Sequence, residues 1–212
     1  MMLRFLDPAN GLSLVGLASA LAGAILAMHG RLAQGLVAMI ASGLCDLFDG
    51  LVARRLTRSD EQKRFGGHLD SVVDAAAFGF APAIWMHAAG VRTLPECALL
   101  AFFAACAVWR LAYFDTVGLS TEGEARYYTG LPVTYVALVL PLVALAGFAG
   151  ASALRWTLDS AAFALALAMV SPFRVRKPGG AMYAVFLFAA AAMILVFTAF
   201  PPPPLAPHGL GK

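Results

Sequence analysis

Seven apolar segments constrain the fold of this chain more than any other feature. Each is long enough, at about 1.5 Å per helical residue, to cross the roughly 30 Å hydrocarbon core of a bilayer. The expected helices cover residues 7–28, 32–56, 65–87, 94–116, 131–148, 154–171 and 182–200. Hydrophobic residues make up 61% of the 212 residues and charged residues 13%, which excludes an ordinary soluble core. We therefore predict an all-α, polytopic membrane bundle with a six-helix catalytic core and a seventh helix at its edge.

The segments between the helices are short and polar. Asp7 followed by Pro8 is typical of a helix start, and we expect this first helix to be retained because no small-residue cleavage site closes it. Residues 57–64 and 118–126 are expected as polar loops. Pro82 is expected to kink the third helix. The organisation predicted is a catalytic membrane domain over residues 1–178, an additional helix over 179–200 and a disordered proline-rich tail over 201–212.

The second apolar segment ends in a set of polar and small residues with helical spacing. These residues fall at i, i+3, i+4, i+7 and i+8 and therefore share one helix face. They are Asp46, Asp49, Gly50, Ala53 and Arg54.

The third segment opens with a related pattern. Asp70 and Asp74 are four residues apart, and Gly66 lies one turn earlier. Two helices that each carry a pair of carboxylates could converge on one site.

Four carboxylates beside apolar segments need compensating cations. Oxygen ligands without Cys or His suit Mg²⁺ or Mn²⁺, and two such ions together suit displacement at phosphorus. Arg54 supplies a planar donor for a phosphate oxygen, and Gly50 and Ala53 leave room for a ligand to approach the helix. The alternative is a set of satisfied ion pairs at helix ends, but it leaves four acids with one arginine on the same face.

The full pattern is D-x-x-D-G-x-x-A-R, about eleven residues, then G-x-x-x-D-x-x-x-D. It resembles the signature of the CDP-alcohol phosphatidyltransferases, with every signature position present. Three further stretches, at residues 78–83, 128–132 and 169–177, are similar to the phosphatidylserine synthase branch of that family. This branch usually has R-L-A-R-F-N where residues 110–115 read R-L-A-Y-F-D, and Tyr-Pro where residues 175–176 read Val-Arg. The departures leave the acceptor alcohol open.

The resemblance implies transfer of a phosphatidyl group from CDP-diacylglycerol to an alcohol, with release of CMP. It implies two divalent metal ions, one held by Asp46, Asp49 and Asp70 and the other by Asp70 and Asp74, with Asp46 a possible shared ligand. Asp74 would also be the general base.

The CDP pocket that the resemblance implies is lined by Gly50, Ala53, Arg54 and Gly66. Asn10 and Ser13 are the polar side chains on the early turns of the first helix. They could reach the nucleotide, or could only cap the helix and hydrogen-bond locally.

For the acceptor we favour L-serine, whose carboxylate needs a cationic partner. Arg110 is the basic residue within its apolar segment, and Tyr128 is a second candidate for acceptor binding. An ion pair between Arg110 and Asp115 is the alternative. Inositol phosphate, glycerol phosphate and choline remain possible acceptors. The partners expected are membrane lipids and a second copy of the chain, and no nucleic acid.

The loops predict the orientation of the bundle. If the amino terminus is cytoplasmic, most basic residues of the short loops fall on that side, which matches the positive-inside rule. The acidic pattern then faces the cytoplasm. A cation or proton transporter is the alternative from another class, because acids within a membrane are often relays. The acids here gather at one surface, and none of the seven helices carries one at mid-depth; Asp159 is the possible exception, but it lies in the outer part of its helix.

Overall fold

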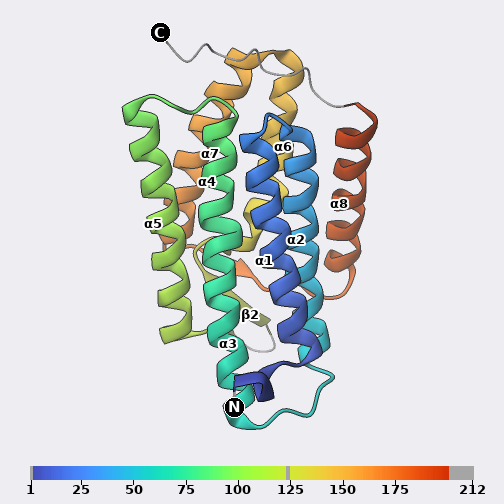
Figure 1. Cartoon of the computed structure of the whole chain (residues 1–212). Coiled ribbons are helices and arrows are strands. Elements are labelled where there is room, and N and C mark those ends of the chain that lie inside the picture. Colours follow the sequence, from blue (N-terminus) through green and yellow to red (C-terminus); the bar gives the residue numbers. More distant parts are fainter. Residues whose placement is uncertain (1, 123–124, 201–212) are drawn as a thin grey trace.

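The protein is a bundle of helices whose axes are roughly aligned, and successive long helices run in opposite directions (Figure 1). The computed structural model describes residues 2–122 and 125–200. Within these ranges the α-helices are α1 Pro8–Met28, α2 Leu32–Ala53, α3 Asp60–Asp74, α4 Ala81–Ala88, α5 Leu94–Val117, α6 Val136–Ala144, α7 Ala151–Val170 and α8 Ala181–Ala199. A π-helical turn, Ala75–Phe80, joins α3 and α4 into one rod, and a short 3₁₀ helix, Met2–Phe5, precedes α1.

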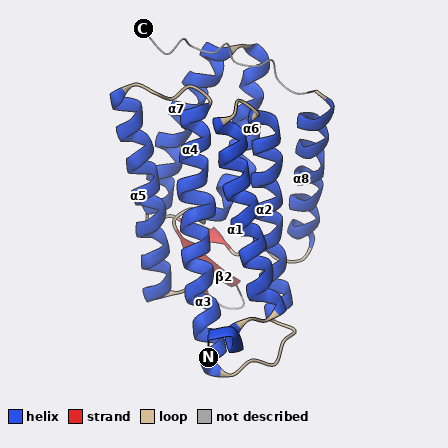
Figure 2. Cartoon of the chain, viewed as in Figure 1, coloured by secondary structure: helices blue, strands red, loops and turns tan. Residues whose placement is uncertain are grey.

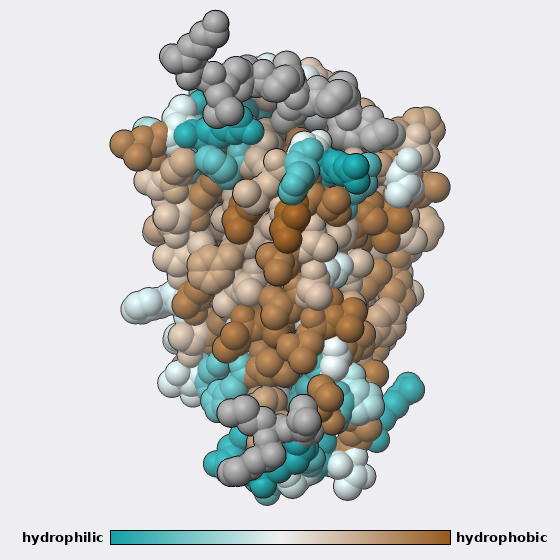
Figure 3. Space-filling view, in the orientation of Figure 1, coloured by the Kyte–Doolittle hydropathy of each residue, from teal (hydrophilic) through white to brown (hydrophobic). Residues whose placement is uncertain are grey.

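The helices have the length and composition of membrane spans. Six stretches qualify within the described residues: Pro8–Met28, Leu32–Ala53, Asp60–Ala88, Leu94–Val117, Ala151–Val170 and Met182–Ala199. A shorter apolar helix, Val133–Ala149, contains α6. Hydrophobic residues cover the middle of the bundle and hydrophilic residues gather toward its two ends (Figure 3). The start of α1 and the end of α8 lie at opposite ends (Figure 1). The predicted membrane-type helical bundle is confirmed.

The third helix begins earlier than its apolar pattern predicts. We expected a loop over residues 57–64, but α2 already ends at Ala53 and α3 begins at Asp60. Ser59 caps α3: its hydroxyl accepts from the Gln62 N–H at 3.2 Å, and the Gln62 side chain accepts from the Ser59 N–H at 3.0 Å. This capping box stabilises a helical first turn made of polar residues. The start predicted from hydrophobicity alone, at residue 65, is therefore too late.

Two other helices are less regular than expected. Pro82 lies in the first turn of α4, where a missing N–H is tolerated, and the irregular π-helical turn comes directly before it. The single helix predicted over 131–148 is wrong in detail. It consists of a 3₁₀ turn Val133–Tyr135, the α-helical α6, and a second 3₁₀ stretch Leu145–Ala149. Pro141 inside α6 accounts for part of this irregularity.

A small antiparallel sheet lies at the end of the bundle that carries the start of α1 (Figure 2). Its strands are β1 Ser120–Glu122, β2 Ala125–Thr129 and β3 Arg174–Arg176, in the order β1-β2-β3. The prediction of a plain linker over 118–126 is therefore wrong. The sheet ties the segment after α5 to the segment after α7, which no periodic pattern within either segment could reveal.

The core is formed mainly by small and apolar side chains between helices. α1 and α2 pack so closely that a Cβ on Gly23 would lie 2.7 Å from the carbonyl oxygen of Gly35. Such small-residue contacts are common between membrane helices. The last helix is peripheral, as predicted: 11% of the residues in the α8 span are buried, against 28–50% in the other five long spans.

Candidate active site

The acids of α2 and α3 converge. One carboxylate oxygen from each of Asp46, Asp49 and Asp70 lies within 4.8 Å of the other two. Asp49 is buried, and Asp46 and Asp70 are partly buried. Asp74, one turn further along α3, is also buried. Two neighbouring helices therefore bring four carboxylates together at one end of the bundle.

A cavity of about 300 Å³ opens beside these acids. All four aspartates line it, together with Gly50 and Arg54 of α2. Residues from α5, the sheet, α6 and α8 complete its wall, among them Arg110, Tyr128, Leu138, Lys177 and Phe186. The cavity thus joins the acidic cluster to a cationic side and to an apolar side.

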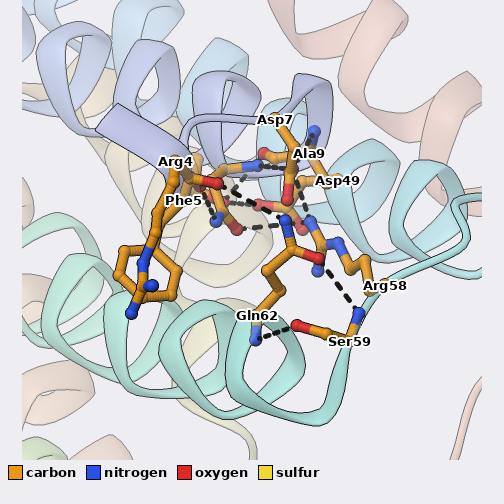
Figure 4. Close-up of polar contacts among 10 residues, drawn as sticks. Arg4, Phe5, Asp7, Ala9, Asp49, Arg58, Ser59 and Gln62 are labelled. Carbon is orange, nitrogen blue, oxygen red and sulfur yellow. Dashed lines mark hydrogen bonds and ion pairs between the residues drawn. The ribbon is translucent and has the colours of Figure 1, made fainter. Parts of the chain in front are cut away.

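The start of α1 is fastened to the acidic cluster by buried polar contacts (Figure 4). The Ser13 hydroxyl donates to Asp49 Oδ2 at 2.5 Å. Asp7 Oδ1 caps α1 by accepting from the N–H of Asn10 at 3.0 Å, and it also accepts from Arg58 Nη2 at 2.6 Å. Arg58 Nη2 lies 3.3 Å from the side-chain oxygen of Asn10 as well. The local capping predicted for this region is present, and Ser13 in addition reaches a signature acid.

The two glycines of the signature have different surroundings. A Cβ added to Gly50 would meet nothing within 4 Å, because Gly50 borders the cavity. A Cβ added to Gly66 would lie 3.1 Å from Arg58 Nη1 and 3.1 Å from Asn10 Oδ1. Gly50 therefore leaves room for a ligand, whereas Gly66 leaves room for two side chains of the protein itself.

Arg110 presents a free edge of its guanidinium group. Its side chain is buried, and Nε and Nη2 have no hydrogen-bond partner among the described residues. The guanidinium lies 5.0 Å from the ring centroid of Phe114 and 5.4 Å from that of Tyr128. Asp115 instead accepts a hydrogen bond from the Ser71 hydroxyl at 2.8 Å. The ion pair between Arg110 and Asp115 is therefore not formed.

A second hollow, of about 510 Å³, is strongly basic. Arg54 at the end of α2, Arg126 in β2, Arg176 in β3 and Lys177 line it, and the Lys177 N–H donates to the Arg126 carbonyl oxygen at 2.8 Å. Burial lowers the pKa of Lys177, and the neighbouring Arg54 and Arg126 lower it further. Because Arg54 and Lys177 also line the first cavity, the basic hollow is an extension of it.

A family model for CDP-alcohol phosphatidyltransferases matches residues 7–199 of the chain. The chain belongs to this family. Family membership together with six long apolar helices makes it an integral membrane protein.

Several curated relatives carry more specific names. The CDP-diacylglycerol–serine O-phosphatidyltransferase of Saccharomyces cerevisiae is 42% identical over 108 residues, which cover 48% of this chain and 38% of the relative. The archaetidylserine synthase of Methanothermobacter thermautotrophicus is 31% identical over 138 residues, 65% of this chain and 57% of the relative. The Mycobacterium leprae CDP-diacylglycerol–serine O-phosphatidyltransferase is 33% identical over 115 residues, 51% and 37%. The chain thus spans roughly two fifths to three fifths of these relatives.

The family signature maps onto the cavity with few exceptions. Eight of the twelve residues predicted for the site line the cavity: Asp46, Asp49, Gly50, Arg54, Asp70, Asp74, Arg110 and Tyr128. The other four, Asn10, Ser13, Ala53 and Gly66, do not line it. Of these, Ser13 donates a hydrogen bond to Asp49, Asn10 accepts one from Arg58, and Gly66 leaves space for the Asn10 and Arg58 side chains.

The acidic cluster of this CDP-alcohol phosphatidyltransferase fits divalent metal ions. Three carboxylates with oxygens within 4.8 Å of one another form an oxygen-only donor set of a kind that Mg²⁺ and Mn²⁺ accept. The fourth carboxylate, on Asp74, borders the same cavity.

Some residues of the site could not be predicted from the sequence. Arg58 lies in a polar loop and becomes significant only when the start of α1 folds against it. Arg126 and Arg176 are brought together by the sheet, whose register pairs Tyr127 with Arg176. Such pairing between segments about fifty residues apart needs the tertiary fold.

Proposed function

We propose that this protein transfers a phosphatidyl group from CDP-diacylglycerol to an alcohol, with L-serine the best candidate, and releases CMP. The observation that carries the proposal is the convergence of Asp46, Asp49 and Asp70 in a cavity that also has an apolar side. A lipid donor with a diphosphate headgroup needs both features in one place.

Each acid has a distinct role in this proposal. Asp46, Asp49 and Asp70 would hold one divalent ion, and Asp70 and Asp74 a second, with Asp46 a possible shared ligand. When bound, two Mg²⁺ or Mn²⁺ ions would supply charge neutralisation for the diphosphate and for the departing CMP. Ser13 holds Asp49 in place through its 2.5 Å hydrogen bond. Arg54 donates to a phosphate oxygen at the rim of the cavity.

The reaction forms one bond and breaks one. The acceptor oxygen bonds to the phosphorus that carries diacylglycerol, and the bond from that phosphorus to the CMP oxygen breaks. Asp74 takes the proton of the acceptor hydroxyl, and the electron pair of the broken bond leaves with CMP. Asp74 borders the cavity from α3, one helical turn beyond Asp70, so its carboxylate can reach a hydroxyl bound beside Asp70.

Arg110 supports an acceptor that carries a carboxylate. Its Nε–H and Nη2–H form the side-on fork that matches the two oxygens of a carboxylate, and both lack a partner within residues 2–122 and 125–200. The guanidinium lies beside the rings of Phe114 and Tyr128, which are in contact with each other. The Tyr128 phenol is neutral near pH 7, as phenols ordinarily are, and can donate a hydrogen bond; burial raises its pKa further. Serine satisfies this site, whereas choline has no anionic group for it.

The basic hollow favours a second class of acceptor. Arg126, Arg176 and Lys177 would suit a phosphate group, as in inositol phosphate or glycerol phosphate. A screen of purified protein with CDP-diacylglycerol and each acceptor, followed by CMP release and lipid analysis, separates the classes. We expect phosphatidylserine as the main product. Transfer only to a phosphorylated alcohol would overturn serine and leave the transfer chemistry intact, and no CMP with any alcohol would overturn the transferase itself.

The family membership also weighs against a transporter. The acids of the cavity lie in the last turns of α2 and the second half of α3, beside the basic residues Arg54 and Lys177 that suit a phosphate headgroup. Uptake of Mg²⁺ or protons by protein-containing vesicles, with no CMP release, would reverse this assignment.

We further propose that the site faces the cytoplasm. The basic residues Arg54, Arg126 and Arg176 surround it, as the positive-inside rule requires. The carboxyl terminus, after seven passes, would then lie on the other side. A reporter fused there that is active only in the cytoplasm would contradict this orientation. The predicted homodimer stays a prediction, which the mass of the purified protein in detergent would test.

A further inference from the structure

The cavity has an apolar end that the headgroup chemistry leaves unexplained. It is lined by Leu44, Leu47, Ala137, Leu138, Phe186 and Ala190. These residues come from α2, α6 and α8, three helices that pack against one another. The charged phosphates of a CDP headgroup would bind beside the aspartates, not against these apolar side chains.

One face of α8 forms the wall of this apolar end. Tyr183, Phe186 and Ala190 fall at i, i+3 and i+7, and all three line the cavity. The distance along the helix from the first to the last is about 10 Å at 1.5 Å per residue. The Phe186 ring packs edge-on against Tyr135, with ring centroids 5.8 Å apart.

The same face of α8 closes the space further along the helix. Met193 packs against the hydrophobic core, and Phe197 is part of it. The seam between α8 and its neighbours is therefore open beside the acids and sealed toward the other end of the bundle. Ala190, 3% exposed, is the last residue of α8 that borders the opening.

We propose that α8 is one wall of a channel for an acyl chain of the donor lipid, and that Phe186 and Ala190 determine which chains fit. The inference rests on the proposed function, because it takes the donor to be CDP-diacylglycerol. The occupant follows from continuity: the acyl chains are joined to the phosphate that must lie at the acids, and the apolar end is the part of the same cavity that leads from the acids along α8. A helix outside the family signature thus sets donor specificity.

The two residues have opposite roles in this channel. Ala190 leaves space at its closed end, where a larger side chain would stop a long acyl chain. Phe186 narrows the channel from one side, and a smaller side chain at this position would admit a bulkier acyl chain.

The test compares two donors, CDP-dioleoylglycerol and CDP-dioctanoylglycerol, with the same acceptor in detergent micelles. Ala190→Leu should lower the ratio of kcat/KM for the long-chain donor to that for the short-chain donor by about 10-fold. Ala191→Leu is the matched control, since Ala191 is exposed on the outer face of α8, and it should leave the ratio unchanged. Two results would contradict the proposed channel. One is an equal loss of kcat/KM with both donors in Ala190→Leu, and the other is the same change of the ratio in Ala191→Leu.

Phe186→Ala gives an independent arm that does not depend on added bulk. For this variant, the ratio of the rate with the branched donor CDP-diphytanoylglycerol to the rate with CDP-dioleoylglycerol should be higher than for the wild-type protein. An unchanged ratio would overturn the role of Phe186. Failure of the wild-type protein to release CMP from any of these donors would instead contradict the proposed function, and the channel with it.

Discussion

The donor side and the acceptor side of the cavity are built in different ways. The donor side consists of side chains at helical spacing on α2 and α3, and its four aspartates are less than thirty residues apart in the sequence. The acceptor side combines Arg110 at the end of α5 with Tyr128 in β2, and β2 is held in place by β3, almost fifty residues later. If the proposed function is right, the comparison teaches that separate elements carry the transfer chemistry and the choice of alcohol, so that each can be changed alone.

The largest expected effect is on the donor side. Asp49→Asn or Asp70→Asn removes a charged ligand while it keeps the side-chain shape, and turnover should fall by several orders of magnitude with every acceptor. The rate of CMP release by the purified variants measures this fall in turnover. Asp60→Asn, which affects only an exposed ion pair with Lys63, should leave turnover unchanged. Near-normal turnover in Asp70→Asn would show that this acid is not required for the reaction.

Asp74→Asn should give the next largest effect and separate binding from transfer. An amide keeps one neutral oxygen but cannot take the acceptor proton, so transfer should fall by about 10²-fold or more. Binding of CDP-diacylglycerol, measured by calorimetry in detergent, should stay close to that of the wild-type protein. A loss of donor binding as large as the loss of turnover would make Asp74 a structural or metal-holding residue only.

Arg110→Gln should act on the acceptor side alone. Loss of a charge-assisted pair to the serine carboxylate should raise the KM for serine by about 10-fold to 100-fold, with little change in the KM for CDP-diacylglycerol. Arg55→Gln, at an exposed position after α2, serves as the control. An unchanged KM for serine with intact turnover would contradict the proposal that Arg110 binds the serine carboxylate.

Gly50→Ala should have the smallest effect and sharpen the contrast between function and stability. The added methyl group meets no atom within 4 Å, and alanine favours the helix by up to about 1 kcal/mol, so the protein should be no less stable to heat. The methyl group points into open space beside the cavity, so the KM for CDP-diacylglycerol should rise several-fold. Gly67→Ala, also in open space but exposed on α3, should likewise be no less stable to heat and should leave the KM unchanged. A lower melting temperature in Gly50→Ala would show that Gly50 is needed for packing instead.

Much of the donor side could be predicted from the sequence, because helical periodicity fixes which residues share a face. Asp46 and Asp49 on α2 and Asp70 on α3 meet as their spacing indicates. Gly66 shows the limit of such reasoning: its spacing is right, but its neighbours are Arg58 and Asn10 rather than the cavity. Which atoms fill the space beside a glycine depends on how α1 and α3 pack, and no local pattern records that.

The acceptor side could be predicted only in part. Arg110 stood out as a basic residue in an apolar helix, and its free guanidinium edge agrees with a binding role. The sheet was missed because its strands are three to five residues long and lie in segments that appear polar and irregular. The start of α3 was missed because a capping box, not hydrophobicity, defines it.

The central claim is that the convergent aspartates hold divalent metal for transfer of a phosphatidyl group. Its most direct test is the metal dependence of CMP release by the purified protein, with CDP-diacylglycerol and L-serine in detergent. The account predicts CMP and phosphatidylserine in equal amounts with Mg²⁺ or Mn²⁺, none in excess chelator, and recovery when metal is restored. Full activity in excess chelator would contradict it.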